Sequence, residues 1–493
     1  MVGRRGRAMS GDFSAPDLRA SDPGASAWVS ASAGSGKTHV LTARVLRLLL
    51  EGTPPGRLLC LTYTRAAAAE MANRVLETLG GWATAGEDEL AKELTATVGR
   101  PPEKAAVDGA RKLFARVLDA PGGLRILTLH AFCQSVLARF PLEAGLSPRF
   151  RVLEEADAEA LLREARESVL RRAQAEPESD LGRALEAVVR HADEGTFSGL
   201  MDELVAGRRR LRRLLDRGGV EDLIRRIRQF LGVGPRETPD SAIAAACQDR
   251  ALARRALGNA VKALDAGSET DRGKAARIGA FLAADAEARP ALFDAYCSAF
   301  LTDKGKPLAK PATKKALDVP GVAETLALEA DRLVAACARA DAARVSRASV
   351  ALAVLGAAVL DAYDAAKRRA ARLDYDDLVL RTLDLLERPG IAPWVLFKLD
   401  GGVDHLLIDE AQDTAPEQWR VVALLAEEFF AGEGARPEAR TVFAVGDVKQ
   451  SIYSFQGADP AAFARMRDHF RARAENAARR FEAVALARSR RSA

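Results

Sequence analysis

A run of small residues ending in lysine and threonine follows an apolar stretch near the start of the chain. Residues 31–38 read Ala-Ser-Ala-Gly-Ser-Gly-Lys-Thr and come directly after the β-prone residues 28–30. They fit the pattern GxxxxGK(S/T), except that Ala31 stands where the first glycine is usual. In such a loop the backbone N–H groups and the start of the following helix face phosphate oxygens.

The side chains at the end of this loop suit a magnesium-bound triphosphate. Lys37 can supply charge to the β- and γ-phosphates, and the Thr38 hydroxyl suits Mg²⁺. The alternative, a chance Gly/Ser-rich turn, is disfavoured by the position between a strand and a helix. The predicted phosphate-binding residues are Ala31, Ser32, Ala33, Gly34, Ser35, Gly36, Lys37 and Thr38.

Two acidic residues follow a second apolar run. Leu406, Leu407 and Ile408 precede Asp409 and Glu410. In an open α/β sheet the carboxyl ends of the strands are where ligands bind. The first carboxylate is suited to hold Mg²⁺ through water, and the second to orient and deprotonate an attacking water. An acidic helix N-terminus is the alternative, and the phosphate loop makes it the weaker one.

A third apolar run, residues 441–445, ends in a polar segment that carries Gln450. This glutamine should lie beside the phosphates if its strand adjoins the strand before Asp409. Tyr453 and Phe455 follow close to Gly457, where exposed rings could stack on bases of any sequence. The alternative for these rings is ordinary packing in the core.

The elements that position these residues fall in three zones. Short β-prone runs alternate with helical patterns over residues 25–140, helical patterns dominate residues 145–370, and strands return after residue 373. We therefore predict an α/β fold: one parallel sheet interrupted by a large all-helical insertion. The expected domains are residues 1–140 and 371–493 for the sheet lobe and 141–370 for the insertion. Two independent α/β domains are the alternative, and a site shared by both halves would decide against them.

Composition excludes several classes of protein. The 493 residues are 48% hydrophobic and 29% charged, which rules out wholesale disorder. A net charge of +5 permits a polyanionic partner. The five cysteines form no CxxC pair, so neither a disulfide scaffold nor a cysteine metal site is indicated. The longest apolar run, residues 348–360, is too short for a bilayer. We expect a cytoplasmic protein without a membrane anchor.

The motifs together resemble the UvrD-like branch of superfamily 1 DNA helicases. They are GSGKT, TYTR with the following AAAAEM, TLHAF at residues 128–132, IDEAQD and GDVKQSIYSFQGA. Within this branch, residues 28–38 and 141–145 are most similar to the AddA group, the helicase subunits of the bacterial AddAB helicase–nucleases. The resemblance covers both α/β zones, and the helical insertion matches only in kind.

The resemblance implies a RecA-like P-loop NTPase lobe that uses ATP and Mg²⁺. Gln450 would sense the γ-phosphate, Arg44 would pack on the adenine and Arg491 would touch the γ-phosphate. The implied catalytic residues are Lys37, Asp409, Glu410 and Gln450, and the implied Mg²⁺ ligands are Thr38 and Asp409. The implied DNA-contacting residues are Tyr63, Thr64, His130, Phe132, Tyr453 and Phe455.

The chain also departs from the family pattern. The adenine-reading glutamine expected upstream of the phosphate loop is absent, and its place is roughly Leu18 or Arg19. Arg490 stands where an aromatic residue would precede Arg491. The second RecA-like lobe, its arginine finger and a nuclease are expected beyond Ala493. We therefore expect a truncated chain that by itself binds nucleotide weakly and hydrolyses it poorly.

The leading expectation is the N-terminal portion of an ATP-dependent DNA helicase or translocase in double-strand-break repair and recombination. The resemblance implies 3′-to-5′ movement, single- or double-stranded DNA ends as substrates and, as partner, an AddB-like nuclease subunit. A non-motor DNA-binding subunit with a vestigial ATPase is one alternative, although such a site has no reason to keep all four catalytic residues. A P-loop ATPase acting on protein or RNA is another. The basic run at residues 208–213 is either a solvated face or a grip on DNA phosphates.

Overall fold

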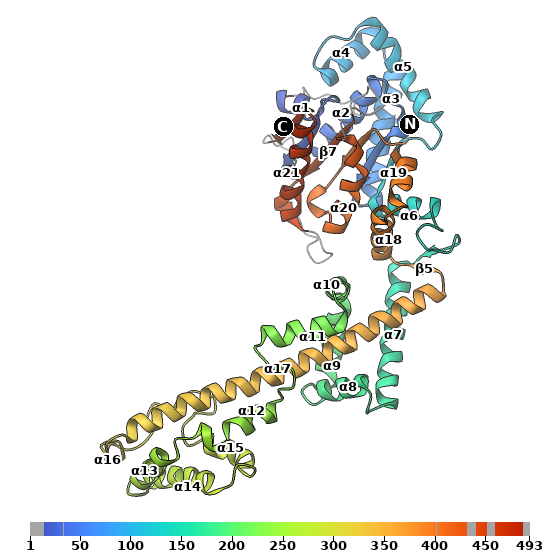
Figure 1. Ribbon diagram of the computed structural model, residues 1–493. Coiled ribbons are helices and arrows are strands. Elements are labelled where there is room, and N and C mark those ends of the chain that lie inside the picture. Colours follow the sequence, from blue (N-terminus) through green and yellow to red (C-terminus); the bar gives the residue numbers. More distant parts are fainter. Residues whose placement is uncertain (1–13, 33, 401, 431–439, 451–458, 487–493) are drawn as a thin grey trace, which may run out of the picture. The chain divides into compact units, whose positions relative to one another are not determined.

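The computed structural model describes residues 14–32, 34–400, 402–430, 440–450 and 459–486. The chain divides into two compact units (Figure 1). Unit 1 combines Met1–Glu155 with Ala370–Ala493, and unit 2 is Ala156–Arg369. Each cluster of buried apolar residues is made up of residues from one unit alone.

Unit 1 contains a six-stranded parallel sheet in the order β3-β2-β6-β7-β1-β8. Strands from beyond the insertion, β6 and β7, lie between β2 and β1, which come from before it. The predicted parallel α/β fold is confirmed, and the alternative of two separate α/β domains is wrong. The strands are β1 (Ser26–Ala31), β2 (Leu58–Thr62), β3 (Arg125–Thr128), β6 (His405–Ile408), β7 (Thr441–Gly446) and β8 (Phe481–Leu486).

Both faces of this sheet are covered, which is why the central strands are mostly apolar and nearly all of their residues are buried. Alternate residues enter opposite cores: Leu59 and Leu61 of β2 pack into one, whereas Leu58 and Cys60 pack into the other. The first core is completed by α6 (Leu129–Arg139), α18 (Tyr375–Glu387), α19 (Ala392–Asp400), α20 (Pro416–Leu425) and α21 (Pro460–Asn476). The second is completed by α2 (Lys37–Leu50), α3 (Arg65–Thr84), α4 (Glu87–Val98) and α5 (Lys104–Leu118).

Threonines mark the turn from strand to helix at two places on the sheet edge. The Thr64 hydroxyl accepts a hydrogen bond from Ala67 N at the start of α3, and Thr128 does the same for Ala131 N at the start of α6. Each bond satisfies a backbone donor that the first helical turn leaves without a partner. Short strands β4 (Arg151–Val152) and β5 (Arg372–Leu373) pair in parallel where the chain leaves and re-enters unit 1.

The regular secondary structure of unit 2, residues 156–369, is helical, apart from an isolated bridge between Leu301 and Pro307. Its long helix α17 (Val322–Arg369) packs along the others (Figure 1). The shorter helices are α7 (Glu155–Ala175), α8 (Asp180–Val189), α9 (Glu194–Ala206), α10 (Arg208–Leu215), α11 (Gly219–Phe230), α12 (Pro239–Ala246), α13 (Arg254–Asp265), α14 (Glu269–Ala283), α15 (Arg289–Cys297) and α16 (Lys314–Leu317).

Helix α17 has the length and the apolar composition that a membrane span requires. About 39% of its most apolar stretch is buried inside the protein. The core helix of a soluble protein has the same composition, so this one helix is weak support for a membrane span.

A buried histidine at the start of β6 makes the stability of unit 1 depend on pH. His405 Nδ1 lies 2.8 Å from Thr441 Oγ1, which also accepts a bond from Arg44 Nη2 at 2.9 Å. Because arginine only donates, the threonine is free to donate its own proton to Nδ1, which suits a neutral ring. Burial, and secondly the charge of Arg44, lowers the pKa of His405 to about 4.

We expect His405→Asn to flatten the pH dependence of unfolding. Between pH 6.5 and 4 the unfolded histidine takes up a proton that the folded one rejects, so the free energy of unfolding falls as the pH falls. At pH 5 the histidine lowers the free energy of unfolding by about 2 kcal/mol. Urea unfolding at pH 7.5 and pH 5, in the wild-type protein and in His405→Asn, measures this loss. An equal loss of stability on acidification in the variant would contradict the assignment.

Candidate nucleotide site

The loop between β1 and α2 has the shape of an anion cradle. Gly34 and Gly36 have φ angles of +75° and +94°, a backbone conformation that side chains with a Cβ rarely adopt. Helix α2 starts directly after them, at Lys37. The Ser35 hydroxyl is buried and has no hydrogen-bond partner among the residues that the structure describes. A phosphate oxygen could accept from this hydroxyl and from N–H groups of the first helical turn, which have no partner within the helix itself.

Three of the predicted catalytic residues meet at this loop, although they come from both halves of the chain. Lys37 Nζ lies 2.8 Å from Glu410 Oε2 and 3.3 Å from Gln450 Oε1. The reason is topological: β1, β7 and β6 are neighbours and run parallel, so their carboxyl ends share one edge. Figure 1 shows α2 and β7 together in the same unit.

The fourth, Asp409, extends the ladder of β6 by donating its backbone N–H to Leu61 O at 2.9 Å. Its Oδ1 accepts from Glu410 N at 2.9 Å. Burial, and secondly the charge of Glu410, raises the pKa of the Asp409 carboxyl to about 6. A nearby divalent cation would favour the ionised form. Mg²⁺ is commonly held by one or two protein oxygens together with substrate phosphates, so the oxygens of Asp409 and Thr38 are of a fitting kind.

Glu410 itself has an unusual backbone. Its φ of +47° lies in the left-handed region, which costs a residue with a Cβ about 1–3 kcal/mol. Such strain persists only where surrounding contacts over-determine it. Here those contacts are Lys37 and Gln412, whose Nε2 donates to Glu410 Oε2 at 2.7 Å.

Gln412 is a residue that the sequence analysis did not single out. Only 1% of it is exposed, and it connects the ends of β6 and β7. The available signal was its place inside Ile-Asp-Glu-Ala-Gln-Asp, where an amide sits among carboxylates.

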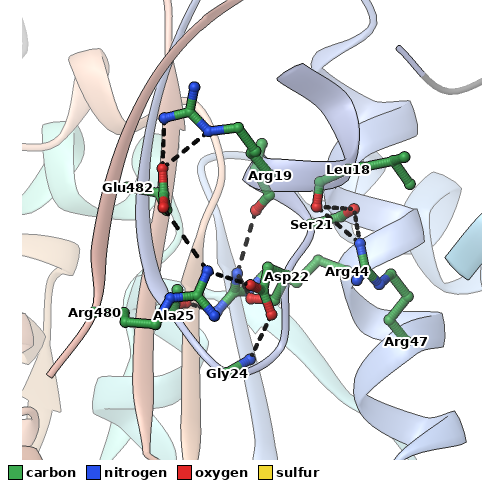
Figure 2. Close-up of polar contacts among 11 residues, drawn as sticks. Leu18, Arg19, Ser21, Asp22, Gly24, Ala25, Arg44, Arg47, Arg480 and Glu482 are labelled. Atoms are coloured by element: carbon green, nitrogen blue, oxygen red, sulfur yellow. Dashed lines mark hydrogen bonds and ion pairs between the residues drawn. The ribbon is translucent and has the colours of Figure 1, made fainter. Parts of the chain in front are cut away.

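Arg44 does not fit its expected role against a base. The residue is 0% exposed, and its guanidinium is held by three carbonyls and a hydroxyl. Nη1 donates to Ala20 O (3.2 Å) and Asp22 O (2.6 Å), and Nη2 to Ala25 O (2.6 Å) and Thr441 Oγ1 (2.9 Å). Figure 2 shows it enclosed by the segment that leads into β1. We therefore correct the expectation: in this structure Arg44 anchors residues 20–25 to the sheet.

The same segment is held at its outer side by ion pairs, as Figure 2 shows. Arg19 donates to Glu482 Oε2 from Nε (3.1 Å) and Nη2 (2.6 Å), and Arg480 Nη2 lies 2.7 Å from Asp22 Oδ2. Leu18 lies at the place expected for a base-reading glutamine, and its carbonyl accepts a hydrogen bond from Arg47 Nη1 at 2.9 Å. Of the two side chains at this place, Leu18 is apolar and Arg19 is paired with Glu482.

Two of the predicted DNA-contacting residues share a pocket at the same edge of the sheet. Tyr63 and His130 line it together with Asp409, Thr414 and Gln418. Both residues are partly exposed. A base could stack on either ring, since every base presents a flat π-face.

Thr64 and Phe132, two further predicted DNA-contacting residues, do not line this pocket. Thr64 is exposed, with its hydroxyl engaged in capping α3. Phe132 is only 1% exposed and belongs to the core. It follows His130 by two positions, about 200° around helix α6, which turns it inward. The expectation that Phe132 touches DNA is therefore corrected. Tyr453, Phe455, Arg491 and Ala33 lie outside the described residues.

The fold and the site define a class of protein. A parallel sheet with a Gly-Ser-Gly-Lys-Thr loop after one strand and an acidic pair after a neighbouring one is the arrangement of a P-loop nucleoside triphosphatase. Residues 17–471 match the family described as UvrD/REP helicase N-terminal domain, and the chain belongs to that family.

Curated relatives agree with this assignment, and they are AddA proteins. The chain is 30% identical over 474 residues to the AddA subunit of the ATP-dependent helicase/nuclease of Desulforudis audaxviator, a match that covers 88% of this chain and 35% of that protein. The corresponding proteins of Geobacillus kaustophilus and Lactobacillus acidophilus are 27% and 26% identical over 94% and 90% of this chain. The chain spans about a third of the length of these relatives: 35%, 37% and 36%. The resemblance to UvrD-like helicases and to AddA is confirmed.

Proposed function

We propose that the protein containing this chain is an ATP-dependent DNA helicase that moves 3′ to 5′ along single-stranded DNA in double-strand-break repair and recombination. Family membership supports the helicase activity, and the names of the relatives support a place in a helicase–nuclease complex. The observation that carries the proposal is the meeting of Lys37 with Glu410 and Gln450, at 2.8 and 3.3 Å. Residues of these types, meeting at a phosphate loop, can bind and hydrolyse a triphosphate.

Each residue has a distinct role in the proposed reaction. The backbone of residues 31–38 holds the phosphates. The ammonium group of Lys37 leaves Glu410 and pairs with the β- and γ-phosphates. Glu410, released from that ion pair, orients the attacking water and accepts its proton. Gln450 senses the γ-phosphate, and Arg491 touches it. Thr38 and Asp409 would hold Mg²⁺, which neutralises developing negative charge when bound.

On the DNA side, we propose that Tyr63 and His130 contact bases of the tracked strand, with Thr64 beside them and Tyr453 and Phe455 as further contacts. Tyr63 follows β2 directly, and His130 lies in the first turn of the helix that follows β3. Both therefore lie at the sheet edge that carries the triphosphate site. A structural change caused by ATP hydrolysis can thus reach the bound DNA strand over a short distance. We propose that the partner is a nuclease-bearing protein similar to AddB, and that the complex acts in the cytoplasm.

Glu410→Gln in the full-length protein should separate binding from hydrolysis. The amide keeps the size of the side chain and cannot accept the proton, so we expect DNA-stimulated ATP turnover to fall by about 100- to 1000-fold. Affinity for a fluorescent ATP analogue should stay within about threefold, because the phosphate loop is intact. Glu428→Gln, a change at an exposed glutamate, is the matched control and should retain wild-type turnover.

Substrate and direction need separate measurements on the wild-type protein. We expect single-stranded DNA to stimulate turnover more than RNA of the same sequence, and duplexes with a 3′ tail to be unwound in preference to those with a 5′ tail. Stronger stimulation by RNA would favour an RNA-directed ATPase. Binding of DNA without any ATP turnover would favour a non-motor subunit.

A further inference from the structure

Gln412 uses each polar atom of its side chain in the site. Nε2 donates to Glu410 Oε2 at 2.7 Å and to Asp413 Oδ2 at 2.9 Å. Oε1 accepts from the backbone N–H of Asp447 at 2.9 Å. With 1% of the residue exposed, solvent cannot replace these bonds if they are lost.

The glutamine holds the carboxylate that the proposed reaction needs. Glu410 Oε2 is fixed by two donors, Lys37 and Gln412. In the proposed function Lys37 leaves this carboxylate for the phosphates. The bond from Gln412 would then be the contact that keeps Glu410 aimed while its backbone stays in the left-handed region.

The same side chain also fixes the neighbouring strand end. Asp447, which donates to Gln412, accepts from Lys449 N through Oδ1 at 3.0 Å and from Gln450 N through its carbonyl at 2.9 Å. Gln412 thus fixes the position of the turn that carries Gln450, through its bond to Asp447. The close fit is visible at Gly446, where an added Cβ would lie 2.7 Å from Gln412 Oε1.

We infer that Gln412 is a positioning residue that fixes Glu410 and the turn of Gln450 relative to each other for ATP hydrolysis. The inference rests on the proposed function. It predicts that loss of the Nε2 donor lowers the rate of the chemical step and leaves nucleotide binding nearly intact, because the phosphate loop is untouched.

The test is Gln412→Glu in the full-length protein, which keeps the size of the side chain and replaces the donor by a carboxylate facing two others. We expect kcat for DNA-stimulated ATP turnover to fall by about 10- to 100-fold, with KM for ATP and the affinity for a fluorescent ATP analogue within about threefold. Gln412→Met removes the donor without adding charge and should lower kcat by about tenfold. Gln174→Glu, at an exposed position in unit 2, is the charge control and should leave kcat unchanged.

The outcomes separate this inference from the proposed function. A wild-type protein without DNA-stimulated turnover would overturn the proposed function itself. With an active wild type, unchanged kcat in both Gln412 variants, or a loss of kcat that only follows a loss of nucleotide binding, overturns the positioning role. If Gln412→Glu does not fold, Gln412→Met decides, and failure of both to fold assigns the residue to stability instead.

Discussion

Replacing Lys37 by alanine in the full-length protein should lower DNA-stimulated ATP turnover by at least about 100-fold. The side chain is 12% exposed, and its ammonium is the group that joins Glu410 to Gln450 at the loop. Without it, the site has lost the mobile positive charge that stabilises the transferring phosphoryl group. Strand separation should stop with it, because the motor then has no source of free energy.

Turnover assays with saturating single-stranded DNA measure this effect, and a strand-displacement assay measures its consequence. Lys112→Ala, at an exposed position on α5, is the matched control. Unwinding that persists unchanged in Lys37→Ala would favour a protein whose DNA function does not depend on hydrolysis.

Arg44→Met should destabilise unit 1 by about 3–5 kcal/mol. The change removes the buried guanidinium that donates to the carbonyls of Ala20, Asp22 and Ala25. The Thr441 hydroxyl loses a donor as well. Burial lowers the pKa of Arg44 to about 9, so the guanidinium remains charged at neutral pH and its bonds are charge-assisted.

Unfolding by urea, followed by tryptophan fluorescence, measures this loss selectively. All four tryptophans, Trp28, Trp82, Trp394 and Trp419, belong to unit 1. Arg116→Met, at an exposed position on α5, is the control and should change stability by less than about 0.5 kcal/mol. Normal stability combined with weakened ATP affinity in Arg44→Met would instead return Arg44 to the role against adenine.

Strand and helix types were predictable because the physics behind them is local. The runs that became β2, β6 and β7 are buried along their whole length, and each is apolar apart from one polar residue at an end, as expected of strands covered on both faces. The meeting of Lys37 with Glu410 also followed from a general rule, that parallel strands present their carboxyl ends at one edge.

The errors come from properties that sequence patterns do not encode. Arg44 lies in a recognisable helix, but its partners are backbone carbonyls, which every residue possesses and no motif marks. Phe132 shares a motif with His130, yet the turn of α6 sends the two to opposite sides. The role of Gln412 depends on its contact with Asp447 at the end of β7, which lies 35 residues away in the sequence and cannot be inferred from the local motif.

The strand order has a consequence for how the protein is made. β1 and β2 leave the ribosome early, and the strands that fill the gap between them, β6 and β7, begin only at His405 and Thr441. At about 5–20 residues per second, translation separates β2 from β6 by tens of seconds. Throughout that interval the nascent polypeptide holds apolar strands with unpaired edges, and chaperone protection during synthesis is expected to matter most for this half of the lobe.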